Sequence, residues 1–509
     1  MAILRFLLLV ATLTLLPQTS TLRVRVRERA TGRATPARIY LTDAAGKLHA
    51  PPGAIVYDRG PEHHFITKGE FQVELAPGGY TLEVERGPEF LAVTRALDIA
   101  AGQARNETID LERWIDMNRL GWYSGDLHNH RAPAEVPDLL LAEDLNFAPT
   151  LADWVWADAQ RSGAPQTTEP FRAVDATHAY SLLDKEVERL EHGPGAVDLV
   201  GLRSPVPFEG YRLYPPSSKF CEAAHAQGAY VDAEKIVWRD VAALVALGHV
   251  DFAGIVHNHF NRHSVELETD RWGMIPKFRP EFNTVAGMPL WSMEVYYRLL
   301  NCGFRLAVSA GSASGVKAAP LGYNRVYVKT SPPFRYERCL AALKQGRSFA
   351  TNGPMLFLTV DGREPGSILR SRAPARVKIR AEALSTRPLE RVEILFRGRV
   401  LKKVEAPSGS RSWTAELETT LDESGWVAAR CFEPAARTIR FAHTSPVYVE
   451  IGSKRAPAGE DARFFIDWID REIDFYSRET GFREPAHRDA MIALFKSARG
   501  VYERLAEER

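Results

Sequence analysis

The chain has 509 residues. A length well above the roughly 150 residues of a typical domain is too great for one hydrophobic core and indicates several domains. Its 65 Lys and Arg residues balance 64 Asp and Glu residues, which leaves a formal net charge of +1. This balance gives no electrostatic reason to expect a nucleic acid or a membrane surface as partner.

The first twenty residues have the pattern of a secretory signal peptide. One early basic residue, Arg5, precedes an apolar run from Phe6 to Leu16, and Pro17 follows. The run is shorter than the roughly 18 to 20 residues that span a bilayer. We therefore expect a cleaved signal over residues 1–20, a secreted or periplasmic protein and no membrane span after cleavage. An uncleaved anchor is the alternative.

The four cysteines are widely scattered and include no C-x-x-C pair, so a zinc knuckle or a redox motif is not indicated. We expect buried free thiols. In an exported protein, a disulfide between two of them is the alternative.

The period of the apolar residues changes three times between residue 21 and the end of the chain. Residues 21–113 alternate over short runs such as "FQVELAPGGYTLEVER", which predicts a β-sandwich. In residues 114–354, short apolar strand candidates alternate with helical stretches such as "RDVAALVALG", which predicts a parallel sheet or barrel. Alternation returns in residues 355–452, a second β-sandwich, and residues 453–509 have the spacing of two amphipathic helices. The predicted class is α/β.

The strongest candidate site lies in "GDLHNH". His128 and His130 are two positions apart, and on a strand this spacing puts both rings on one face, roughly 6.5 to 7 Å apart along the chain. Neutral imidazoles suit Zn, Mn or Fe. Asp126 is a candidate to orient a ligand histidine through its free N–H. The alternative is a pair of polar residues on a loop.

Further donors follow the predicted strands of the central region. Glu186 and Glu188 lie in "LLDKEVERLEHG", Glu234 follows apolar "GAYV", and His259 lies in "FAGIVHNHFNRH". Carboxylates and imidazoles at strand ends are the ligands of hydrolytic metal sites. The alternative for Glu186 and Glu188 is a solvated helix face. A solvated surface charge is a less convincing alternative for Glu234. A carboxylate that directly follows an apolar strand is costly to bury without a partner, and a metal ion would be such a partner.

Taken together, "GDLHNH", the polar strand ends and "SFATNGP" before a β region resemble the PHP (polymerase and histidinol phosphatase) superfamily, in its secreted CehA/McbA-type group. The resemblance covers about residues 118–355. It implies a distorted (β/α)7 barrel flanked by the two β-sandwiches, with metal ions at the strand ends and hydrolysis of phosphoesters, esters or carbamates. His128 and His130 match the family's first H-x-H, Glu186 or Glu188 its bridging Glu, and His259 a ligand His.

Three departures from that family pattern reduce the expected metal content. Trp154 stands where the family has His, Glu234 replaces a His as an oxygen ligand, and "GSASG" has Ala313 and Gly315 where the family has Asp and His. Neither Ala nor Gly can coordinate through a side chain. The resemblance therefore implies one or two divalent ions (Zn, Mn or Fe) and not three.

Arg325, after Gly322, is a candidate to steady developing negative charge, with a structural ion pair as the alternative. Eight aromatic residues are expected to be core or, at a barrel mouth, to favour a sugar or aromatic substrate: Trp122, Trp154, Trp156, Trp238, Trp272, Trp291, Tyr296 and Tyr297. The expected function is hydrolysis of a small molecule by metal-activated water. The rival is a catalytically degenerate barrel that acts as a ligand- or glycan-binding protein.

Overall fold

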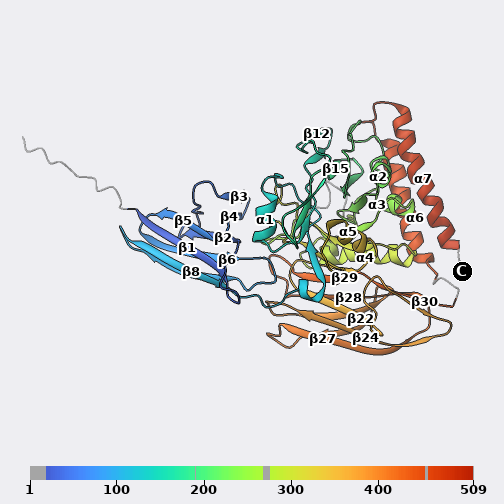
Figure 1. Ribbon diagram of the computed structural model, residues 1–509. Helices are drawn as coiled ribbons and strands as arrows, with labels where there is room; N and C mark the ends of the chain where they lie inside the picture. The colour runs from blue at the N-terminus through green and yellow to red at the C-terminus, as the bar shows by residue number, and fades with distance from the viewer. Residues whose placement is uncertain (1–18, 190, 268–274, 453–456, 508–509) are drawn as a thin grey trace, which may run out of the picture.

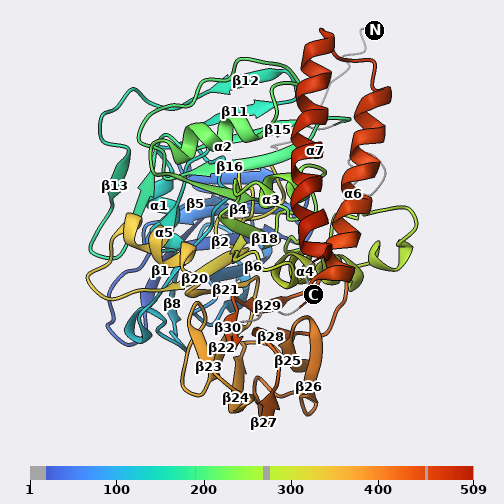
Figure 2. The same ribbon diagram turned by 90° about the vertical axis from the view of Figure 1, so that its right-hand side faces the viewer.

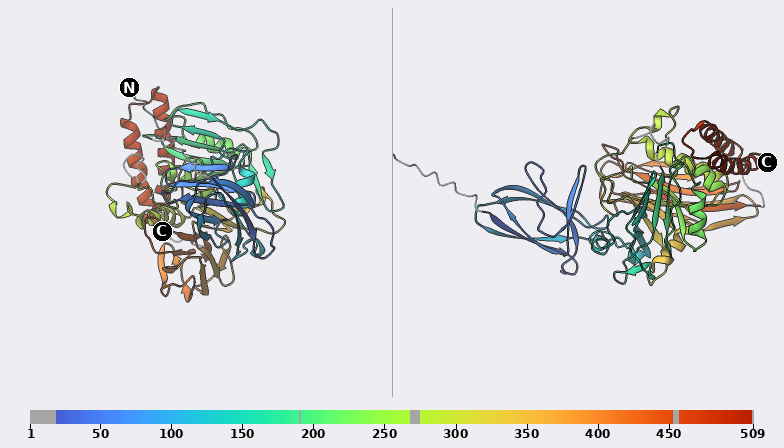
Figure 3. Two further views of the ribbon diagram at one scale, coloured as in Figure 1. Left: turned by 90° about the vertical axis from the view of Figure 1, so that its left-hand side faces the viewer. Right: turned by 90° about the horizontal axis from the view of Figure 1, so that it is seen from above.

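The computed structural model describes residues 19–189, 191–267, 275–452 and 457–507. Most of the predicted signal peptide, and also Trp272, lie outside these ranges. An elongated N-terminal β unit extends from one side of a larger mixed α/β body, and two long helices cover the opposite side (Figure 1; Figure 3, right). The mixed α/β class predicted from the sequence is confirmed. Within the described ranges no helix is both long enough and apolar enough to cross a membrane.

The N-terminal unit consists of two facing sheets, as the alternating pattern predicted. Alternate side chains of each strand enter a shared core that includes Leu22, Ile39 and Leu82. One sheet has the order β5 (Glu70–Leu75), β1 (Ser20–Glu28), β8 (Ala104–Leu111). The other has the order β3 (Ile55–Arg59), β4 (Glu62–Thr67), β2 (Ala37–Asp43), β6 (Gly78–Glu85), β7 (Val93–Ile99).

A seven-stranded sheet forms one part of the central region. Its order is β12 (Ala159–Ser162), β11 (Asp153–Trp156), β15 (Lys185–Arg189), β16 (Gly195–Val200), β17 (Tyr230–Ala233), β18 (Phe252–Val256), β19 (Ala307–Ala310). The sheet is mixed and not fully parallel, because β16 is antiparallel to both neighbours. Only five residues connect β15 to β16, and a connection this short permits an antiparallel pair but no parallel crossover.

A twelve-stranded sheet runs from the central region into the C-terminal region. Ten strands follow one path: β13 (Phe171–Ala173), β14 (Ala179–Ser181), β10 (Phe147–Ala148), β9 (Trp122–Gly125), β20 (Arg325–Lys329), β21 (Ser348–Thr351), β29 (Phe441–Thr444), β28 (Gly425–Phe432), β25 (Arg391–Phe396), β26 (Arg399–Glu405). The strands β30 (Val447–Ile451) and β23 (Ile368–Ser371) branch from β28. Pairing of β21 with β29 joins the two regions through backbone hydrogen bonds.

The C-terminal region is completed by a three-stranded sheet, β22 (Met355–Val360), β24 (Ala375–Leu384), β27 (Ser412–Leu421), which shares a core with β25 and β28. Five shorter helices belong to the central region: α1 (Val136–Ala142), α2 (Ser218–His225), α3 (Val241–Ala246), α4 (Gly287–Asn301) and α5 (Tyr336–Lys344). Two 3-10 turns are η1 (Asn118–Leu120) and η2 (Pro280–Phe282).

The chain closes with the two predicted amphipathic helices, α6 (Gly459–Arg478) and α7 (Pro485–Glu507). They lie side by side along the body in two views (Figures 1 and 2). Tyr502 of α7 anchors the pair, since its hydroxyl donates to the carbonyl of Ala242 in α3 at 2.9 Å. All four cysteines are buried and free, which confirms the expectation of unpaired thiols.

Candidate metal centre

The segment carrying His128 and His130 directly follows β9 and runs beside the small-residue stretch 310–315. The N–H of Leu127 donates to Ala310 O at 3.0 Å, and that of His130 donates to Ser314 O at 2.8 Å. The two segments approach so closely that a Cβ atom on Gly311 would lie 2.4 Å from Cβ of His128. The small residues of "SAGSASG" therefore make room for the histidine segment, and the stretch contributes no ligand side chain.

His128, His130 and Glu186 form the compact donor group. One ligand atom from each lies within 4.8 Å of the others. The two Nε2 atoms are 3.0 Å apart. The Glu186 oxygens lie 3.3 Å from His128 Nε2 and 3.0 Å from His130 Nε2. Glu186 is buried on β15, so the alternative of a solvated helix face is wrong for this residue, because pairing with β11 and β16 holds the segment as an inner strand.

Asp198 is a member of the site that sequence reasoning missed. It lies on β16, is fully buried, and places Oδ2 at 3.4 Å from His128 Nδ1. Neither of its oxygens has a hydrogen-bond partner with good geometry among the described residues. The signal was present in "AVDLVGL", where one carboxylate interrupts an apolar strand. A buried, unpaired carboxylate at such a position is costly and points to a cation nearby.

Glu234 lies near the site but outside the compact group. Its carboxylate accepts from Lys235 Nζ at 2.6 and 2.7 Å and from Trp238 Nε1 at 2.6 Å. Glu234 Oε2 also lies 3.5 Å from His128 Nδ1, on the opposite edge of that ring from His130. The geometry therefore gives Glu234, with Asp198, the orienting position that the sequence analysis assigned to Asp126.

Asp126 has a different task from the expected one. Its carboxylate accepts the backbone N–H groups of His128 at 3.1 Å, Ser312 at 2.9 Å and Gly322 at 2.7 Å. It thereby fastens the histidine segment to the adjacent loop without facing an imidazole nitrogen. Burial raises the pKa of Asp126, although these three hydrogen bonds oppose the shift.

Arg325 is not in the site either. Its guanidinium is buried and donates to Gly322 O at 2.6 Å and to Glu143 O at 3.2 Å. It lines a separate cavity where the N-terminal, central and C-terminal regions meet, whereas the residues lining the histidine pocket do not include it. The charge-stabilising role expected for Arg325 therefore has no geometric basis at this pocket.

A pocket of about 310 Å³ gives access to the donor group. Glu188 and His259 line it, together with three indoles, those of Trp154, Trp156 and Trp238. Trp154 packs against His130 with ring centroids 4.6 Å apart. His259 points Nδ1 towards the carbonyl of Glu266 at 3.0 Å and is not part of the compact group. Two of the predicted ligands, Glu188 and His259, are thus wall residues of the pocket.

The acidic and basic side chains of the site strongly shift one another's pKa values. Burial alone would raise the pKa of Glu186, but His128 and His130 outweigh it and hold that pKa at about 2. Burial raises the pKa of Glu188, and the charge of Glu186 raises it further, to about 8. Burial disfavours a charged His128, yet Asp198 and Glu186 raise its pKa well above the usual value. The site therefore places a carboxylate that is held ionised, Glu186, and one that is largely protonated at neutral pH, Glu188, beside two imidazoles.

Comparison with known proteins does not assign the chain to a family. No family model and no curated protein matches the sequence. A solved structure, "The Bacillus anthracis TIE protein", is similar to 22% of this chain and 19% of its own chain, with 15% identity and a TM-score of 0.15. A similarity of this extent does not define the fold of the chain.

Proposed function

We propose that the protein is an exported metal-dependent hydrolase of ester, phosphoester or carbamate bonds in small molecules. His128, His130 and Glu186 would hold a divalent ion of the Zn, Mn or Fe class. The observation that carries the proposal is the convergence of their ligand atoms within 4.8 Å in a buried site. The resemblance to a PHP-type barrel, which rests on the sequence motifs, agrees with a site of this composition.

The balance of buried charge fits a cation. Glu186, Asp198 and Glu234 are all buried and lie 3.3, 3.4 and 3.5 Å from His128 nitrogens. Lys235 is the one buried lysine among the residues lining the pocket. Lys235 is already paired with Glu234 at 2.6 Å. Several buried carboxylates with so little positive charge carry a large desolvation cost. Two imidazoles and a carboxylate form a donor set that Zn, Mn and Fe accept.

The surrounding residues prepare this donor set. Asp198 and Glu234 face Nδ1 of His128, and a carboxylate there fixes the tautomer that leaves Nε2 unprotonated for an ion. Asp126 holds the backbone of the same segment. When bound, the metal would lower the pKa of a water molecule and polarise the bond to be cleaved. Residues of this chain thus supply both the ligands and their orientation.

The pocket walls suit a substrate with an aromatic or sugar ring. Trp154 and Trp156 meet edge to face at 5.4 Å, and Trp156 is 43% exposed. An exposed indole beside a buried polar centre offers a stacking surface for a flat or apolar group. Arg161 lies 5.1 Å above the Trp154 ring and adds positive charge to the lining.

The test combines metal content with turnover. Wild type and the variant His128→Ala/His130→Ala would be purified, loaded with Zn or Mn, and measured by elemental mass spectrometry and by assays on aryl esters, aryl phosphates and aryl carbamates. We expect about one equivalent of metal and turnover in the wild type, and loss of both in the variant. Equal metal content in the two proteins would refute the site.

A matched control removes two histidines elsewhere. His63 and His192 lie outside the pocket, so His63→Ala/His192→Ala should retain metal and activity. The rival function, a ligand-binding protein without catalysis, has its own signature in the same experiment. A wild type that binds metal at the histidines but turns over none of the three substrate classes would favour it.

A further inference from the structure

A second cavity, of about 160 Å³, lies where the N-terminal, central and C-terminal regions meet. Five arginines line it: Arg38, Arg262, Arg325, Arg387 and Arg440. They come from β2, the loop after β18, the start of β20, the β24–β25 connection and the residue before β29. Among the described residues, two carboxylates, Glu85 and Glu143, line the same cavity and pair with Arg38. Arg262 and Arg440 pair with Glu83 at 2.7 Å and Glu433 at 3.3 Å, which leaves Arg325 and Arg387 without an ion pair in the described ranges. None of these five arginines lies at the histidine pocket.

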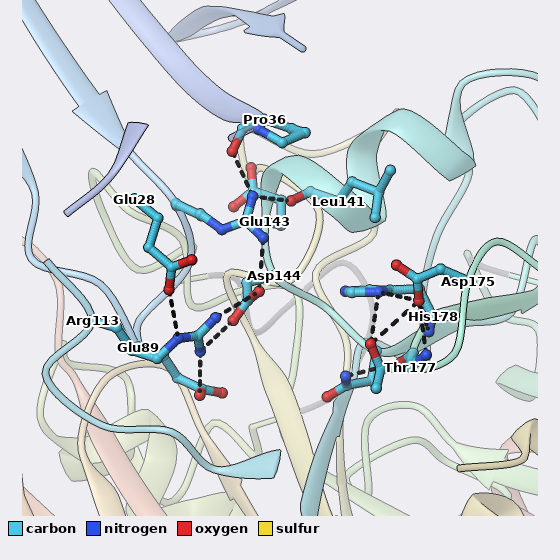
Figure 4. A network of polar contacts seen from close by, with 12 residues as sticks. Glu28, Pro36, Glu89, Arg113, Leu141, Glu143, Asp144, Asp175, Thr177 and His178 are labelled. Atoms are coloured by element: carbon cyan, nitrogen blue, oxygen red, sulfur yellow. Dashed lines mark hydrogen bonds and ion pairs between the residues drawn. The ribbon is translucent and has the colours of Figure 1, made fainter. Parts of the chain in front are cut away.

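Nearby arginines show what full pairing looks like in this part of the molecule. Arg113 contacts Glu28 at 3.8 Å, Glu89 at 3.1 Å and Asp144 at 2.8 Å, all of which can be followed in Figure 4. Arg86 is paired with Asp144 at 3.0 Å. These two arginines occupy the Asp144 carboxylate, so it is not available to the cavity.

Arg325 has no such partner. Its side chain is 1% exposed, and its contacts are with carbonyl and hydroxyl oxygens, those of Gly322, Glu143, Asp144 and Ser124. Among the described residues no carboxylate lies within 4.0 Å of its guanidinium; the Glu143 carboxylate is instead bound by Arg38. A buried guanidinium without a counter-ion is costly, which points to an anion in the cavity that it lines.

Glycines bring the guanidinium groups close to the backbone around this cavity. A Cβ atom on Gly322 would lie 2.7 Å from Nη2 of Arg325, and one on Gly353 would lie 2.4 Å from Nε of Arg440. Gly353 belongs to "SFATNGP", which contributes Asn352 and Gly353 to this cavity and no residue to the lining of the histidine pocket. Any larger residue at either position would displace an arginine. The glycines thus help to shape the positive cavity.

We propose that this cavity binds a phosphate group, either as the free ion or as part of a larger phosphorylated molecule. Guanidinium forks match the oxygens of a phosphate in pairs. A volume of about 160 Å³ compares with about 30 Å³ for a liquid water molecule, so a single tetrahedral oxyanion has room. Arg387 is exposed and forms no ion pair among the described residues, so it is placed to close over the anion from the solvent side.

Calorimetric titration of the full chain with inorganic phosphate tests the proposal. Metal would first be removed with a chelator, so that phosphate cannot bind at the histidine site. We expect one saturable site in the wild type and at least about tenfold weaker binding in Arg387→Ala, since a charge-assisted contact is lost. Arg437→Ala, at an exposed arginine in a neighbouring loop outside the cavity, should bind like wild type.

The variant Arg325→Lys gives a second test, because lysine retains the positive charge but lacks the paired N–H donors of a guanidinium. Weaker phosphate binding in this variant would support a bidentate contact. Titration with glycerol phosphate separates the two sources. Tighter binding of the ester would assign the site to a larger phosphorylated ligand, and tighter binding of the inorganic ion to free phosphate. Absence of saturable phosphate binding, or equal affinity in wild type and Arg387→Ala, would overturn the proposal.

Discussion

Asp198 Oδ2 lies 3.4 Å from Nδ1 of His128, and the two side chains are both buried. The carboxylate on β16 therefore sets the face that the imidazole turns towards His130 and Glu186. If His128 is a metal ligand, Asp198→Asn should weaken metal binding by about 10- to 100-fold while leaving the ligand atoms in place. Competition with a chromogenic chelator measures the affinity.

The control for Asp198 is another fully buried aspartate of the same region. Asp184 accepts backbone N–H groups from Gly201 and Leu202 at 2.8 and 2.9 Å and has no contact with the histidines. Asp184→Asn should leave metal affinity unchanged. An Asp198→Asn protein with wild-type affinity would show that His128 is oriented by other means.

Glu186 and Glu188 differ in position although they lie two residues apart on one strand. Glu186 contacts both Nε2 atoms, whereas Glu188 lies outside the compact group and lines the pocket. Glu186→Gln should abolish stoichiometric metal binding, and Glu188→Gln should retain it. Elemental analysis of the two purified variants decides the question. The reverse result would assign the ligand to Glu188.

Asp126 serves the stability of the histidine segment. Asp126→Ala would leave the N–H groups of His128, Ser312 and Gly322 without their acceptor. Since each unsatisfied buried group costs about 1 to 3 kcal/mol, we expect a loss of about 3 kcal/mol or more in the free energy of unfolding. Urea denaturation measures it. A change below about 1 kcal/mol would mean that other groups or water replace the carboxylate.

His443 predicts a pH dependence of stability. Its Nδ1–H donates to the carbonyl of Thr444 at 2.7 Å, so Nε2 accepts from the hydroxyl of Tyr297 at 2.7 Å. Burial lowers the pKa of His443 to about 3. The unfolded chain, with a histidine pKa of about 6.5, therefore binds the proton first as the pH falls, and stability is lost below about pH 6.5.

The expected contribution is about 1.4 kcal/mol per pH unit, which amounts to about 2 kcal/mol between pH 7.5 and 5.0. Urea denaturation of wild type and His443→Gln at both pH values isolates the contribution of His443 to the free energy of unfolding. The stability gap between the two proteins should narrow by that amount at pH 5.0. A gap that is constant with pH would show that His443 becomes protonated in the native state.

The close spacing of His128 and His130 correctly indicated that they lie together, although both follow β9 and do not lie on a strand as expected. Glu186 could be named only as one of a pair, since its strand is defined by pairing with β11 and β16 and not by its own charged sequence. Asp198 was missed for the same reason. The partners of Asp126 and Arg325 are set by chain crossings that local patterns do not encode.

The regional pattern of strands and helices was likewise readable, whereas the connections between sheets were not. The apolar period predicted β structure before and after the central region and two helices over the last residues, as observed. The antiparallel placement of β16 and the continuity of one sheet across the central and C-terminal regions depend on which edges meet. Such long-range pairing leaves little trace in a single sequence.

The apolar pattern of the sequence changes at residue 354, but the backbone hydrogen bonds between β21 and β29 connect the regions on either side of it. A chain shortened to that point would expose the backbone of Phe349, Ala350 and Thr351 as a free sheet edge next to a newly uncovered apolar surface. Free edges of this kind recruit other chains. The last region therefore protects the central one from self-association.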